Sequence, residues 1–233
     1  MVNPDVVTTR VVPIGQTVAI ILNTPASTNT GIPTNGVWVI AGVHGDEPVP
    51  PYALFTRWRS FSWQTPTVVI PFANPSTLVA PSRTKRYGLG FDGGVAGNEE
   101  FWAGVESVAA QFVVPRLVLD LHEDGDVPRR LGGAYVYHHG NHLELPFNLV
   151  ELWLGLGVPV LRRWVTRFGE PVVGGVVVGG DDESIDERFR QQFGSEVLVV
   201  ESPTQGMTVD ARRFVHTVAV DSIPYLWKTL NSG

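Results

Sequence analysis

The sequence contains no cysteine. This absence excludes disulfide bonds, thiolate metal sites and cysteine nucleophiles, so any metal ion must be held by His, Asp and Glu side chains. Charged residues make up only 17% of the 233 residues, and the net charge of -6 comes without any basic stripe. A nucleic acid is therefore not expected as a partner, because binding to its phosphates needs clustered Lys and Arg.

Long apolar segments are missing as well. The most apolar stretches, such as residues 176–180, are far shorter than the roughly 20 residues of a membrane-spanning helix. The N-terminus contains Asp5 and has no basic start followed by an apolar run, so no signal peptide is expected. We therefore expect a cytoplasmic protein with no membrane partner. No GxSxG pattern occurs, which argues against a serine hydrolase.

Hydrophobic residues make up 43% of the chain, and we expect a single catalytic domain over residues 1–233. Continuous apolar runs rich in β-branched residues alternate with helix-like segments. This pattern predicts an α/β fold with a mixed, mostly parallel sheet flanked by helices. Strands are expected at residues 17–22, 37–41, 67–71, 116–120, 134–137, 158–161, 172–178 and 196–200. Helices are expected at residues 52–60, 99–112, 146–156, 185–193 and 211–230, with Ser184 as an N-cap.

The clearest chemical pattern follows the expected strand at residues 37–41. Gly42 leads into His44-Gly45-Asp46-Glu47, which places a histidine and a glutamate three residues apart. Open α/β sheets bind their ligands at the carboxyl ends of strands. His44 and Glu47 are therefore candidates to hold one metal ion, although an HxxE pattern taken alone is equally compatible with a structural or surface role.

Two further strands end in polar side chains of the same kind. His122 follows the strand at residues 116–120 and is surrounded by acidic residues, and carboxylates commonly orient metal-bound imidazoles. Two His and one Glu would leave a fourth tetrahedral position for water, which is typical of a catalytic zinc. Glu201 ends the strand at residues 196–200 and is placed to act as the base that takes a proton from that water.

The order of these motifs along the chain resembles that of the zinc carboxypeptidase family. The order is HxxE, an Asn-Pro loop with an arginine, a strand-terminal His and a strand-terminal Glu. The segment AGVHGDE is most similar to its short branch, the aspartoacylase and succinylglutamate desuccinylase group and the murein peptide amidases. The resemblance covers about residues 37–218 and implies a three-layer sandwich. It also implies that His44, Glu47 and His122 ligate one zinc ion and that Glu201 is the general base. The chain has no room for the additional β-domain of the aspartoacylase group, so an amidase-type core is expected.

The resemblance also identifies candidate substrate contacts. Asn74-Pro75 matches the family's Asn-Pro loop, and Arg83 matches the arginine that stabilises the oxyanion. An Asn-Arg pair that grips a substrate carboxylate in the family falls here on Asp92-Gly93. Asp92 would repel a carboxylate and attract an amine, unless Arg86 restores the clamp from a lengthened loop. Asn74, Arg86 and Asp92 are therefore the predicted substrate-binding residues.

The sequence leaves two interpretations for each of two further groups, a pair of tyrosines and a cluster of three histidines. The tyrosine that many family members carry shortly before the catalytic glutamate is absent, and Tyr135 and Tyr137 are either pocket or core residues. The segment YHHGNH contains His138, His139 and His142 and predicts a polar loop after a strand, with a second metal site as the alternative.

These observations predict a zinc-dependent hydrolase that cleaves an amide bond of a small N-acyl amino acid or short peptide through a metal-activated water. One alternative is a family member that binds metal and a ligand or partner without turnover. Another is an esterase, because the same water and base serve both bonds.

Overall fold

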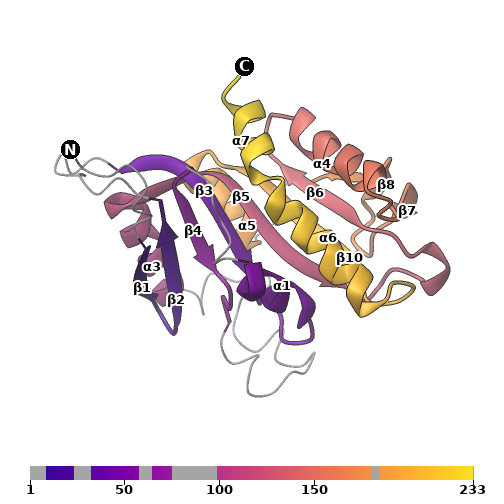
Figure 1. The fold of residues 1–233 in the computed structure, drawn as a ribbon, viewed down its shortest axis with the longest axis horizontal. Coiled ribbons are helices and arrows are strands. Elements are labelled where there is room, and N and C mark those ends of the chain that lie inside the picture. Colours follow the sequence, from indigo (N-terminus) through magenta and orange to yellow (C-terminus); the bar gives the residue numbers. More distant parts are fainter. Residues whose placement is uncertain (1–8, 24–32, 58–64, 75–98, 180–183, 233) are drawn as a thin grey trace.

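The computed structural model describes residues 9–23, 33–57, 65–74, 99–179 and 184–232, which form a mixed sheet with helices on both faces (Figure 1). Within these ranges the sheet has ten strands, in the order β1-β2-β4-β3-β5-β10-β6-β9-β8-β7. The strands are β1 (Thr9–Ile14), β2 (Thr17–Leu22), β3 (Thr34–Ala41), β4 (Thr67–Ile70), β5 (Val113–Asp124), β6 (Tyr135–His139), β7 (Arg163–Val165), β8 (Pro171–Val173), β9 (Val176–Val178) and β10 (Glu196–Pro203). The helices are α1 (Val49–Arg57), α3 (Glu99–Gln111), α4 (Glu144–Gly155), α5 (Ile185–Phe193), α6 (Val209–Asp221) and α7 (Ile223–Leu230), with a 3-10 turn at Arg129–Leu131.

The centre of the sheet is parallel. β4, β3, β5 and β10 are neighbours that run in the same direction, so the carboxyl ends of β3, β5 and β10 meet at one edge. Antiparallel pairs flank this centre on both sides, at β2–β4 and at β10–β6. The predicted mixed α/β class is confirmed, with its parallel part concentrated in the middle strands.

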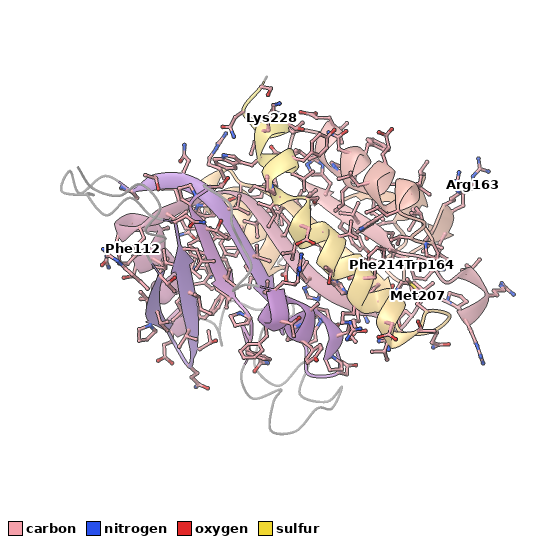
Figure 2. All side chains as sticks on the ribbon, viewed as in Figure 1. Phe112, Arg163, Trp164, Met207, Phe214 and Lys228 are labelled. Carbon is pink, nitrogen blue, oxygen red and sulfur yellow. The ribbon has the colours of Figure 1, made fainter. Side chains whose placement is uncertain are left out.

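Two apolar clusters hold the three layers together, and side chains fill the space between sheet and helices (Figure 2). One cluster joins the sheet to α1, α4, α6 and α7, and the other joins it to α3 and α5. In Figure 1, α6 lies in front of the sheet and α5 lies behind it. Side chains alternate between the two faces along a strand. Val118 on β5 belongs to the α3 and α5 side, so Asp120 and His122 project on that side too.

The structure departs from the expected elements in several places. Residues 158–161 form no strand beyond a single bridge between Val160 and Ala134, since Pro159 lacks the N–H that a ladder needs. The expected strand at residues 172–178 is a hairpin, because Gly174 and Gly175 turn the chain with φ of +62° and +88°. The expected helix at residues 211–230 is two helices that meet at Ser222.

The predicted N-cap at Ser184 is confirmed. Ser184 caps α5, and its hydroxyl accepts a hydrogen bond from the backbone nitrogen of Glu187 at 3.1 Å. Among the helices in the described ranges, none is long and apolar enough to cross a membrane.

Candidate metal centre

The turn after β3 places the HxxE segment at the carboxyl edge of the parallel strands. Gly42 has a φ of +71°, and a Cβ there would lie 3.1 Å from the Cα of Phe72, so glycine fits this turn best. The segment after β4 pairs with the turn, because the nitrogens of Ala73 and Asn74 donate to the carbonyls of Ala41 and Gly42, each at 2.9 Å. These bonds hold the start of the HxxE segment against the segment that follows β4.

His44, Glu47 and His122 converge on one point. Nδ1 of His44 lies 2.7 Å from Oε1 of Glu47, and Nδ1 of His122 lies 3.0 Å from Oε2 of the same carboxylate. All three side chains are buried, and their ligand atoms lie within 4.8 Å of one another. Two imidazole nitrogens and a carboxylate are donors that zinc takes, and they leave a position for water. The residues present therefore fit the predicted metal ion.

The charges at this point reinforce one another. Burial would raise the pKa of Glu47, but the positive potential of His44 and His122 and their hydrogen bonds hold that pKa far below its ordinary range. Burial would lower the pKa of His122, but Asp120 and Glu47 raise it well above its ordinary value. Without a metal ion the ionised Glu47 therefore pairs with the two imidazoles, and a metal ion bound here would displace their protons.

Asp120 lies on the other side of the His122 ring. Its Oδ2 is 3.1 Å from Nε2 of His122, and its side chain is fully buried. Nδ1 of His122 faces Glu47 while Nε2 faces Asp120, so the ring bridges two carboxylates. This is the arrangement in which a carboxylate fixes the orientation of a metal-binding imidazole.

Glu201 stands beside His122 on the neighbouring strand. The two residues are register partners in the parallel β5–β10 pair, so their side chains share one face of the sheet. On its other side Glu201 pairs with Tyr135 of β6. Burial raises the pKa of Tyr135 and of Tyr137, and the nearby charge of Glu201 raises both further. Glu201 is half-buried, next to the candidate ligands and next to two tyrosines.

Solved structures share this architecture. No family model and no curated protein matches the sequence. A protein from Shewanella denitrificans that is assigned as a metallopeptidase aligns with a TM-score of 0.70 and 18% identity, over 95% of this chain and 84% of that one. A metallo-carboxypeptidase from Burkholderia cenocepacia gives a TM-score of 0.63 and 16% identity, with 95% and 65% covered. An aspartoacylase family protein from Mesorhizobium loti aligns with a TM-score of 0.58 and 16% identity, over 95% of this chain and 68% of that one. The chain has the metallocarboxypeptidase fold.

In this metallocarboxypeptidase fold the predicted substrate contacts fall mostly in residues 75–98, outside the described ranges. Arg83, Arg86 and Asp92 lie there. Asn74 is described and is 1% exposed, and its Nδ2 lies 3.4 Å from the carbonyl of Val43, next to His44. Asn74 thus supports the HxxE turn, and its contact with substrate stays a prediction.

The three histidines of the YHHGNH segment each face a different carboxylate. The pairs are His138 Nε2 with Glu196 Oε2 at 2.9 Å, His139 Nδ1 with Glu187 Oε2 at 3.4 Å, and His142 Nδ1 with Glu144 Oε1 at 2.9 Å. The sequence predicted a polar loop here. In the structure His138 and His139 are instead buried within β6, so that prediction was wrong for these two residues. Among the described residues these three histidines do not form a metal-binding group.

The sequence did not reveal the partners of two acidic residues near the metal centre. Glu123, next to His122, accepts a hydrogen bond from the backbone nitrogen of Val49 at 3.0 Å and pairs with Arg212 of α6. Asp186 of α5 forms a second buried group with Asp120 and His122. The only sequence signal for Asp186 was its place in the first turn of a helix capped by Ser184, which does not reveal what that helix packs against.

Proposed function

We propose that the protein is a zinc-dependent hydrolase that cleaves an amide bond of a small N-acyl amino acid or a short peptide. The observation that carries the proposal is the convergence of His44, Glu47 and His122 on one point, with Glu201 in register with His122 on the adjacent strand. The shared fold with a metallo-carboxypeptidase and an aspartoacylase family protein supports the same class of reaction.

The chain's own residues divide the work of such a reaction. His44, Glu47 and His122 would hold the ion, and Asp120 would hold the ring of His122 in place. When bound, zinc supplies Lewis acidity, which acidifies water and polarises a carbonyl oxygen. Glu201 would take the proton of the attacking water and deliver it to the departing nitrogen, since one carboxylate can serve as base and then as acid.

The surroundings of Glu201 suit this proton transfer. Its carboxylate is half-buried and close to the hydroxyls of Tyr135 and Tyr137. The hydroxyl of Tyr135 donates its proton to Oδ2 of Asp124 at 2.5 Å, so it does not donate to Glu201. Arg83 would complete the site by stabilising the oxyanion. Asn74, Arg86 and Asp92 would select the substrate.

The variant Glu201→Gln tests this mechanism, because it preserves the size of the side chain and removes its basicity. We expect one zinc ion per chain in both proteins, measured by atomic absorption, and loss of turnover on a panel of N-acyl amino acids and dipeptides. Glu151→Gln, which changes an exposed carboxylate of α4, should keep full activity. Full activity in Glu201→Gln would refute the mechanism.

The same panel separates the alternatives. Turnover of matched esters without turnover of amides would identify an esterase. One zinc ion per chain without turnover of any amide, peptide or ester would favour a protein that binds metal and a ligand without catalysis.

A further inference from the structure

Two buried carboxylates, Asp120 and Asp186, lie close to the ring of His122. Asp120 precedes His122 by two residues on β5, and its Oδ2 is 3.1 Å from Nε2 of the ring. A carboxylate oxygen of Asp186, from α5, lies within 4.8 Å of both a ring nitrogen of His122 and an oxygen of Asp120. The exposed fractions of Asp120 and Asp186 are 0% and 7%, so these two charges meet the ring in a water-poor environment.

The position of Asp186 follows from the way α5 is fixed on the sheet. Ser184 caps the helix, and Phe189 is fully buried in the apolar cluster between α5 and the sheet. Glu187, one residue after Asp186, lies 3.4 Å from Nδ1 of His139 on β6. With α5 held at both points, its first turn is placed beside His122. The positive end of the helix dipole also favours a carboxylate in that turn.

The chemistry of a metal-binding imidazole explains why such carboxylates matter. An imidazole that binds a metal through Nδ1 must carry its proton on Nε2. A buried N–H needs an acceptor, and an ionised acceptor makes the ring a stronger ligand. Asp120 places a carboxylate oxygen 3.1 Å from Nε2. The additional charge of Asp186 strengthens the field that keeps the proton on Nε2.

We propose that Asp186 is a positioning residue that acts with Asp120 as a two-carboxylate clamp on His122, fixing the ring with Nδ1 toward the metal. This inference rests on the metal centre of the proposed function and adds a role that neither the strand-end pattern nor the family resemblance assigns. Asp186 does not contact the substrate or the ion in this role. It acts through the orientation and basicity of His122.

The test compares the zinc affinity of the protein with and without the carboxylate of Asp186. Asp186→Asn keeps the shape of the side chain and removes its charge, and competition with a chromophoric chelator gives the zinc dissociation constant. We expect one zinc ion per chain and an affinity about 10- to 100-fold weaker than that of the wild type. The thermal midpoint of the metal-free variant should match or exceed that of the wild type, because a buried charge has been removed.

Glu187→Gln is the matched control. It alters the next residue of the same helix and weakens the contact with His139, so it reports any loosening of α5. Its zinc affinity should stay near the wild-type value. Asp186→Ser, which keeps a small polar residue in the first turn, provides the same comparison if the Asn variant does not fold.

The outcomes are distinguishable. Wild-type zinc affinity in Asp186→Asn and Asp186→Ser overturns the clamp and leaves the proposed function standing. Two metal ions in the wild type and one in Asp186→Asn would make Asp186 a ligand of a second ion, which also overturns the clamp. A wild-type protein that binds no zinc would overturn the proposed function and this inference together.

Discussion

Glu123 and Val49 connect β5 to the start of α1, because Oε2 of Glu123 accepts a hydrogen bond from the backbone nitrogen of Val49 at 3.0 Å. The first N–H groups of a helix have no partner inside the helix, so this bond satisfies one of them. Glu47 precedes Val49 by two residues and His122 precedes Glu123 by one. The bond therefore fixes the distance between two candidate metal ligands from the opposite face of the sheet.

Replacement of Glu123 by alanine should destabilise the protein. The change removes the partner of Arg212, whose side chain is only 13% exposed, and leaves the nitrogen of Val49 without an acceptor. Breaking a buried ion pair from one side costs about 3 kcal/mol or more. Urea denaturation of the metal-free protein measures the loss. Arg213→Ala removes an exposed pair with Asp210 and should cost less than about 1 kcal/mol. Equal losses in the two variants would show that Glu123 has no such role.

The sequence was sufficient to propose candidate site residues where polar side chains follow apolar strands. His44, Glu47, His122 and Glu201 could each be proposed because their strands have continuous apolar runs, and parallel strands end at one edge of a sheet. The register of the β5–β10 pair, which the structure supplies, places His122 and Glu201 on the same face. Local patterns were thus enough to propose that His44, Glu47 and His122 lie close together, and the role of Glu201 stays a prediction.

Contacts between distant segments were not visible in the sequence. Glu123 and Arg212 are 89 residues apart, and no sequence pattern around either residue predicts that they form a pair. Asp186 is an ordinary helix-start acid until the packing of α5 is known. β7 has three residues and was missed, since so short a strand carries no detectable period.

Zinc should stabilise the folded protein if His44, Glu47 and His122 bind it. A ligand that binds only the folded state adds about 2.7 kcal/mol at a concentration 100 times its dissociation constant. We expect the thermal midpoint of the wild type to rise as zinc is added and to fall back when a chelator removes it. The His44→Ala variant should show no such rise. His142→Ala, which changes an exposed histidine, should respond like the wild type. A zinc response in His44→Ala equal to that of the wild type would place the metal elsewhere.

Glu196 should be important for stability and irrelevant to metal content. Its carboxylate faces His138 and accepts hydrogen bonds from the backbone nitrogens of Asn141 and His142 at 3.0 Å and 3.1 Å. Burial alone would raise the pKa of Glu196, but these hydrogen bonds have the larger effect and the pKa is lowered. The folded state therefore favours the ionised carboxylate. Glu196→Gln should lose about 1–3 kcal/mol at neutral pH, measured by urea denaturation. Zinc content should not change, and a drop in zinc content would revive a metal role for the histidine segment.

His216 makes the stability of the protein depend on pH in a predictable direction. It is fully buried on α6, and its Nε2 lies 2.8 Å from the hydroxyl of Ser202 on β10. Burial, together with the positive potential of His122, lowers its pKa from 6.5 to about 3. In the unfolded chain the same histidine binds a proton near its ordinary pKa of 6.5. The unfolded state therefore holds one more proton between these two values.

Stability is consequently present above a pH of about 6.5 and is lost as the pH falls toward about 3, by up to about 1.4 kcal/mol per pH unit. The measurement is the free energy of unfolding in urea at several pH values in this window, with zinc removed by a chelator. His216→Gln should flatten the dependence by about one proton relative to the wild type, because the group that charges only on unfolding is gone. His142→Gln removes an exposed histidine and should keep the wild-type slope. Identical slopes in the wild type and His216→Gln would mean that the buried imidazole takes up its proton without unfolding.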